Sequence, residues 1–198
     1  MARVLINHGW TNQRPTDHWQ HLTATKLRQQ GHQVQYPQYP ETMNPSFDAW
    51  NQLLLAELQQ QIAIGEQAGE RIAIAHSLGC VNWLMAAVAG QISEPVDRLL
   101  LVAPADPQLL SELEGFELSL ANPHLAEAVR ASAKSVTLLG SDEDRWTPNG
   151  LQATFGSVLG VEAIIIEGAG HLTSAEGWGQ WSGLTKWVND AEADLRIR

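Results

Sequence analysis

Short apolar runs alternate with stretches of helical periodicity along this chain. The runs are Val4–Ile6, Val34–Tyr36, Ile72–Ala75, Leu99–Val102, Val136–Leu139 and Ala163–Ile166. Several are apolar throughout rather than alternating with polar residues, which is typical of β-strands covered on both faces. The pattern therefore predicts six strands separated by helices, with several of the strands buried on both faces.

The stretches between the runs carry apolar residues at helical spacing. One helix is marked by Phe47, Trp50, Leu54 and Leu58, and Asn44-Pro45 just before it is predicted to supply the cap and the first-turn proline. A second helix is expected from Leu78 to Ala89, with Gly90 placed to end it. A C-terminal helix is marked by Trp178, Trp181, Leu184 and Val188, with the tryptophans expected in the core.

Alternating strands and helices predict an α/β fold in which a mainly parallel sheet carries helices on both faces. A strand order such as 2-1-3-4-5-6 fits, and the site is then expected beyond the carboxyl ends of the strands. The length of 198 residues suits one domain spanning residues 1–198. The stretch from Pro104 to Ala133 exceeds one crossover helix, so we expect two short helices there, forming a minimal cap.

Composition narrows the class of protein. Apolar residues make up 44% and charged residues 17% of the chain, as in ordinary globular domains. A net charge of −10 repels a phosphate backbone, so nucleic-acid binding is not expected. The single cysteine, Cys80, allows no intramolecular disulfide and fits a reducing compartment. No apolar segment reaches signal-peptide or transmembrane length, so we expect a cytoplasmic protein without membrane association.

The segment from Ile72 to Cys80 carries the main chemical signal. A buried strand runs into Ala75-His76-Ser77-Leu78-Gly79, which matches the nucleophile elbow G-x-S-x-G with Ala75 in place of the first glycine. A strained strand-to-helix turn needs small neighbours, and the positive end of the following helix suits a developing oxyanion. Ser77 is therefore predicted to be a nucleophile, against the simpler interpretation that it only caps a helix.

A serine nucleophile needs a general base and an acid, which on such a fold follow later strands in the order Ser, acid, His. His171, after a glycine-rich strand exit, is the base candidate. The acid candidates are Asp142, Glu143 and Asp144 after one strand, and Asp106 after the preceding one.

The first strand exit reads Asn7-His8-Gly9-Trp10, where a glycine lets the backbone approach a substrate. The amides of Trp10 and Leu78 are then the expected oxyanion-hole donors. His8, Gly9 and Trp146 are expected near the substrate, and the two bulky indoles suggest a shallow pocket for short acyl groups.

These pieces together resemble the small serine hydrolase family typified by retinoblastoma-binding protein 9 and its bacterial relatives. The matching segments are His8-Gly9-Trp10, Asp17-His18-Trp19-Gln20, His76-Ser77-Leu78-Gly79, Gly140-Ser141-Asp142-Glu143-Asp144 and Gly170-His171. The resemblance implies an α/β-hydrolase fold and hydrolysis of ester or amide bonds. In that family the catalytic acid is the second member of an acidic pair and is usually followed by proline, which implies that the acid here is Asp144. This sequence departs from the pattern, because it has Glu143 as the first acid and Arg145 in place of the proline.

The function expected from the sequence is therefore hydrolysis of small-molecule carboxylic esters through a Ser77–His171–Asp144 triad and an acyl-enzyme. The alternatives are an amidase or peptidase with the same triad, and a non-catalytic binding module on the same fold. His18 and His21 beside Asp17 would suit a zinc site, but no further ligands complete it, so neither a metal nor another cofactor is expected. The sequence identifies no protein partner.

Overall fold

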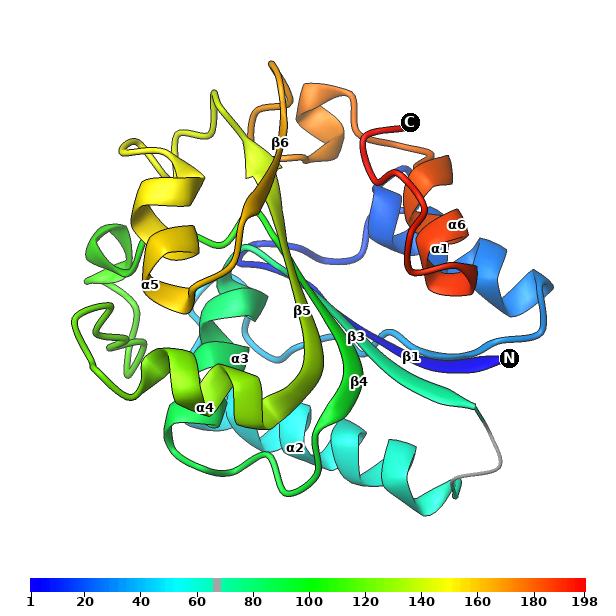
Figure 1. The fold of residues 1–198 in the computed structure, drawn as a ribbon, viewed down its shortest axis with the longest axis horizontal. Coiled ribbons are helices and arrows are strands. Elements are labelled where there is room, and N and C mark those ends of the chain that lie inside the picture. Colours follow the sequence, from blue (N-terminus) through cyan, green and yellow to red (C-terminus); the bar gives the residue numbers. More distant parts are fainter. Residues whose placement is uncertain (66–68) are drawn as a thin grey trace.

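The computed structural model describes residues 1–65 and 69–198, and its centre is a six-stranded parallel sheet (Figure 1). The strands are β1 (Ala2–Asn7), β2 (Gln33–Gln35), β3 (Glu70–His76), β4 (Val96–Val102), β5 (Ala133–Ser141) and β6 (Ala163–Ile166). Their order is β2-β1-β3-β4-β5-β6, and each neighbouring pair is parallel. The predicted α/β class and strand order are both confirmed.

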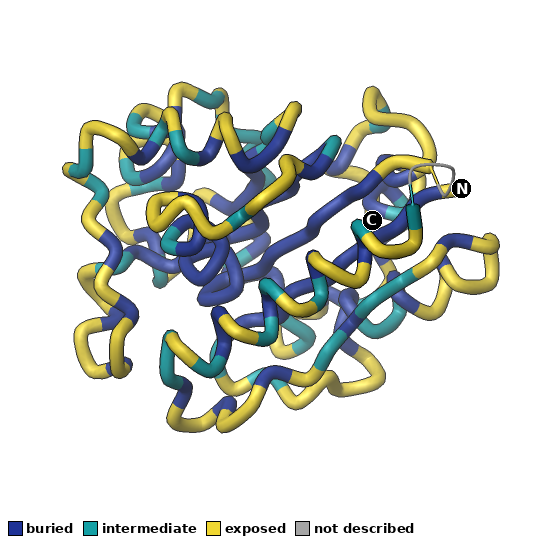
Figure 2. The backbone as a smooth tube through the Cα atoms, turned by 90° about the horizontal axis from the view of Figure 1, so that it is seen from below, coloured by how far each residue is buried: buried dark blue, intermediate teal, exposed yellow. Residues whose placement is uncertain are grey.

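Two helical layers cover the sheet. In Figure 1, α1 (Trp19–Gln29) and α6 (Ser182–Asn189) lie on one face, and the remaining helices lie on the other. These are α2 (Phe47–Ala63), α3 (Leu78–Val88), α4 (Leu125–Ser132) and α5 (Ser157–Leu159). In β3, Ile72 and Ile74 join the core under α1 and α6, while Ala73 and Ala75 face the other core. Because both faces are covered, the central strands form a buried centre (Figure 2), whereas the edge strands β2 and β6 are only partly buried or exposed.

Two predicted helix boundaries are wrong. The cap of α2 is Ser46, whose Oγ accepts a hydrogen bond from the Ala49 amide at 3.4 Å. A bridge between Ser46 and Glu114 holds Ser46 in the extended conformation that a cap needs, so Asn44-Pro45 stays outside the helix. The last helix begins at Ser182, so Trp178 and Trp181 precede it, although both are buried as expected.

The segment after β4 forms the expected short helices. A 3-10 helix, η2 (Pro107–Leu110), follows the strand exit, and α4 leads into β5. The residues between them are turns and irregular backbone. Figure 1 shows this segment looping beside α4 and α5, so the cap is minimal, and the described residues form no separate lid. Within the described residues, no helix has the length and apolarity that crossing a membrane would require.

Three buried arginines lie near the amino ends of the central strands. Arg3 and Arg71 are partners in register, and Arg98 pairs with Ile72 on the next strand. Arg3 donates to the Gln61 and Gly69 carbonyls at 2.6 and 2.7 Å. Arg98 donates to two carbonyls in the last turn of α6 at 2.5 and 2.7 Å. These bonds tie α2 and α6 to the end of the sheet opposite the candidate site.

Candidate active site

Ser77 lies at the turn between β3 and α3. Its backbone has φ 55° and ψ −121°, a left-handed conformation that is strained for a residue with a side chain. Neighbouring glycines make the turn possible, because a β-carbon on Gly79 would lie 2.7 Å from the His8 carbonyl oxygen. A β-carbon on Gly9 would lie 2.7 Å from the Ser77 β-carbon. The turn therefore presents the hydroxyl beyond the end of the strand.

Ser77, His171 and Asp144 form one chain of hydrogen bonds. The His171 Nε2 atom lies 2.8 Å from Ser77 Oγ, and its Nδ1 atom lies 2.8 and 3.0 Å from the two Asp144 carboxylate oxygens. An ionised carboxylate only accepts, so Nδ1 carries the proton and Nε2 accepts from the serine hydroxyl. The Trp146 amide donates to Asp144 at 2.9 Å and fixes the carboxylate in place. This arrangement can draw the proton from Ser77.

The other acid candidates have different partners. Asp142 accepts a hydrogen bond from the Gly168 amide at 2.8 Å, and Asp106 caps η2 by accepting from the Gln108 amide at 3.0 Å. Glu143 is exposed, and its side chain makes no hydrogen bond to His171 in the described residues. Among the four candidates, the carboxylate that reaches His171 is Asp144.

The two expected oxyanion donors border the same cavity. Trp10 and Leu78 both line it, together with Ser77. In the part of the chain that the structure describes, neither amide donates to a protein acceptor. Both donors therefore remain available to an oxygen that develops charge beside Ser77.

His8 is fully buried and does not line the cavity, unlike Gly9 and Trp146, which do. The His8 Nε2 atom accepts from the Tyr39 amide at 3.0 Å, so the proton sits on Nδ1, which donates to the Gly9 carbonyl at 2.9 Å. Burial lowers the pKa of His8 to about 4 and keeps it neutral. Because one planar peptide joins the Gly9 carbonyl to the Trp10 amide, His8 orients that amide without itself lining the cavity.

The His76 side chain is hydrogen-bonded to the backbone of His171. The His76 Nε2 atom donates to the His171 carbonyl oxygen at 2.9 Å, and the two rings lie 5.0 Å apart between centroids. Burial holds the pKa of His76 well below its usual range, so the ring stays neutral beside the base. Sequence reasoning missed this contact, because the position before the serine gave no sign of a bond to residue 171.

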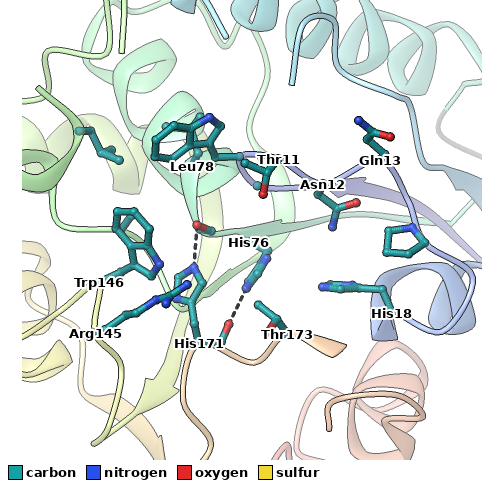
Figure 3. Close-up of a pocket in the computed structure, with 16 residues that line it drawn as sticks. Thr11, Asn12, Gln13, His18, His76, Leu78, Arg145, Trp146, His171 and Thr173 are labelled. Carbon is teal, nitrogen blue, oxygen red and sulfur yellow. Dashed lines mark hydrogen bonds between the residues drawn. The ribbon is translucent and has the colours of Figure 1, made fainter. Parts of the chain in front are cut away.

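The cavity above these residues has a volume of about 460 Å³ and two chemically different halves (Figure 3). One half is apolar and is lined by residues that belong to or pack against one hydrophobic cluster, which are Trp10, Leu78, Ala105, Leu110 and Trp146. The other half is polar and is lined by residues that the sequence did not single out as substrate contacts, which are Asn12, Gln13, His18 and Thr173. Arg145 is exposed at the edge, with its guanidinium 5.8 Å from the Trp146 ring. Tertiary packing decides which half of the cavity each residue lines, so the sequence pattern could not predict it.

The residues considered for zinc do not gather into a ligand set. His18 caps α1 by accepting from the Gln20 amide at 3.2 Å, while His21 lies further along the helix and does not line the cavity. Among the described residues, no group of three histidine, cysteine or acidic side chains is arranged to hold a metal ion.

Comparison with known proteins identifies relatives of this fold. A family model described as serine hydrolase matches residues 4–190. Comparison with curated protein sequences gives no significant match. Among solved structures, the ydeN gene product of B. subtilis is similar with a TM-score of 0.76 and 20% identity over 96% of this chain and 97% of that one.

Two further solved structures share the fold at lower similarity. The esterase domain of a Rhodothermus marinus protein has a TM-score of 0.59 and 16% identity over 89% of this chain and 80% of that one. The α/β-hydrolase domain-containing protein 10 from mouse has a TM-score of 0.62 and 16% identity over 95% and 88% of the two chains. At these identities the structural likeness establishes the fold.

Proposed function

Because this chain belongs to the serine hydrolase family, we propose that it hydrolyses carboxylic esters of small molecules through Ser77, His171 and Asp144. The membership agrees with the resemblance found in the sequence motifs. The observation that carries the proposal is the continuous hydrogen-bond chain from Ser77 Oγ through His171 to Asp144, with links of 2.8 Å on each side of the imidazole. The likeness to an esterase domain supports the choice of ester over amide substrates.

The reaction proceeds in two halves. Ser77 Oγ attacks the ester carbonyl carbon while His171 Nε2 takes the serine proton, and the amides of Trp10 and Leu78 hold the oxyanion. The tetrahedral intermediate then collapses, and His171 returns the proton to the departing alcohol. Water attacks the acyl-serine by the same route, which releases the acid and restores the hydroxyl. Asp144 stabilises the imidazolium in both halves.

The test is labelling by a fluorophosphonate together with turnover of p-nitrophenyl butyrate. Ser77→Ala should abolish both labelling and turnover and change the melting temperature only slightly, because the side chain loses one hydroxyl. Unchanged labelling of this variant would place the nucleophile elsewhere. A wild-type protein that takes no label would favour the non-catalytic binding module. Faster turnover of a matched anilide than of the ester would make the protein an amidase.

A second arm tests the acid by amide substitution. Asp144→Asn should lower turnover by about 10⁴-fold, because the histidine loses the carboxylate that holds its tautomer. Asp142→Asn, Glu143→Gln and Asp106→Asn are the matched controls and should each cost far less. A comparable loss at Asp106 would move the acid to the exit of β4.

A further inference from the structure

His18 presents a hydrogen-bond donor to the polar half of the cavity. The His18 Nδ1 atom accepts from the Gln20 amide at 3.2 Å, and a backbone amide can only donate, so the ring proton sits on Nε2. The residue is 4% exposed and lines the cavity, and Nε2 has no hydrogen-bond partner in the described residues. Burial lowers the pKa of His18 to about 4, so this donor is uncharged near neutral pH.

Thr173 presents an acceptor to the same half. Its hydroxyl donates to Glu176 Oε2 at 2.9 Å, and Glu176 also accepts from the Thr173 amide at 3.0 Å. Although burial raises the pKa of Glu176, hydrogen bonds from the backbone amides of His171 and Thr173 and from the Thr173 hydroxyl hold it below its usual range. An ionised carboxylate only accepts, so the Thr173 hydroxyl donates to it. The Thr173 oxygen also accepts from the Glu176 amide in a capping box, which leaves one lone pair for a ligand.

Two further polar side chains, Asn12 and Gln13, line this half, and Asn12 is tied to its own neighbours. The Asn12 side chain accepts from the Arg14 amide at 2.6 Å and donates to the Gln20 side chain at 3.1 Å. The buried part of the polar half thus offers a neutral donor on His18 and a neutral acceptor on Thr173, and the exposed Gln13 amide at its edge can both donate and accept. A hydroxyl group, which both donates and accepts, complements this pair, whereas a carboxylate needs donors and an ammonium needs acceptors.

The position of this half relative to His171 indicates which side of the ester it meets. In Figure 3, His18 and Thr173 lie on one side of His171, and Trp146 lies on the other. Ring centroids follow in the order Trp146, His171, His76 and His18, separated by 6.0, 5.0 and 5.8 Å. With the acyl group between the indoles, the departing alcohol extends toward His18.

We propose that the polar half is a subsite for a hydroxyl group on the alcohol portion of the ester, bound between the His18 Nε2–H donor and the Thr173 Oγ1 acceptor. The substrate class is then a short acyl ester of an alcohol that carries at least one further hydroxyl. This inference rests on the proposed esterase function, and it assigns His18 and Thr173 as specificity-determining residues.

The experiment compares two esters with the same acyl group and the same three-carbon alcohol skeleton, 2,3-dihydroxypropyl butyrate and propyl butyrate. Acid release gives kcat/KM for each, and the ratio of the two values reports the subsite. The wild-type ratio should favour the dihydroxy ester. His18→Asn keeps an oxygen that can cap α1 but withdraws the donor from the cavity, so the ratio should fall about 10-fold, the worth of one hydrogen bond.

Matched variants separate this effect from damage to the fold. His21→Asn makes the same substitution on the same helix outside the cavity and should keep the wild-type ratio. Thr173→Val should lower the ratio of the two kcat/KM values. Thr173→Ser retains the hydroxyl and should keep the wild-type ratio. Melting temperatures of all four variants report whether each one folds.

Three results would contradict the proposed subsite. A wild-type enzyme that hydrolyses both esters without preference would overturn the subsite while leaving the esterase function standing. Equal losses on both esters in His18→Asn would also overturn it, because His18 would then act only on the fold. Hydrolysis of neither ester would overturn the proposed function and this inference with it.

Discussion

Ser77 holds its hydroxyl at the cost of backbone strain. Its φ of 55° and ψ of −121° are the mirror image of a conformation that ordinary residues favour, so glycine adopts them freely. Residues held in such regions cost about 1–3 kcal/mol each and persist where the surrounding structure over-determines them. Here the glycines at positions 9 and 79 and the Ser77 amide, which donates to the Val102 carbonyl at 3.0 Å, fix the turn.

The strain predicts an unusual order of stability between two inactive variants. Ser77→Gly should be more stable than Ser77→Ala by about 1 kcal/mol, because both lose the hydroxyl but only glycine relieves the strain. Urea denaturation measures the difference. Ser157, in α5 with φ −64°, is the control, because glycine there should be less stable than alanine. If alanine is more stable than glycine at position 77 as well, Ser77 is not strained.

At the scale of elements, the cavity is bounded by loops at the carboxyl ends of the strands. The segment after β4 contributes Ala105 and Leu110, and the loop after β5 contributes Trp146. The Trp10 and Trp146 rings meet edge to face at 6.0 Å between centroids and close the apolar half. The segment that could form a cap holds only short helices, η2 and α4, in the described chain, so we expect the apolar half to be shallow.

This shallow half predicts a preference for short acyl groups. Each added methylene contributes about 0.8 kcal/mol only while it can be buried, so kcat/KM for p-nitrophenyl esters should peak between acetate and butyrate. Trp146→Ala should move the peak toward longer chains by opening the wall. A wild-type maximum at octanoate or beyond would show that the cap segment moves aside to lengthen the pocket.

Sequence patterns predicted the strands and their order because both faces of the sheet are buried, which leaves apolar runs in the chain. The helix ends were less predictable, since Ser46 caps α2 through a bridge to Glu114, a residue distant in sequence. The meeting of Ser77, His171 and Asp144 follows from the rule that parallel strands end at one edge. His8 is oriented by the Tyr39 amide, which is distant in sequence. The hydrogen bonds of His18 and Thr173 are local, but tertiary packing decides that both residues line the cavity, so no local motif could reveal that.

At the scale of the molecule, buried histidines make stability depend on pH. Burial lowers the pKa of His32, and it lowers the pKa values of three others further. The pKa of His8 and of His18 is lowered to about 4, and that of His76 is held well below its usual range, in each case mainly by burial. Between about pH 6.5 and pH 4 the unfolded chain therefore binds protons that the folded chain refuses. Stability is fully present above this window and is lost as pH falls through it.

The expected loss is up to about 1.4 kcal/mol per pH unit for each histidine, measured as the free energy of unfolding in urea at steps from pH 7.5 to pH 4.5. His18→Asn should flatten the dependence of stability on pH, because one of these groups no longer titrates. A curve that is flat in the wild type across this window would contradict the buried, neutral state of these rings.

The arginines lie at the amino ends of the strands, and the cavity loops lie at the opposite, carboxyl ends. The arginine end holds helices to the sheet, whereas the cavity loops are free to vary in sequence. The central strand β3 has seven residues and is about 20 Å long, so Arg3, Arg71 and Arg98 lie far from the cavity loops. Substitutions that far apart have nearly independent effects on stability. Selection or design can therefore rework the cavity loops for a new ester while the arginine end keeps the architecture intact.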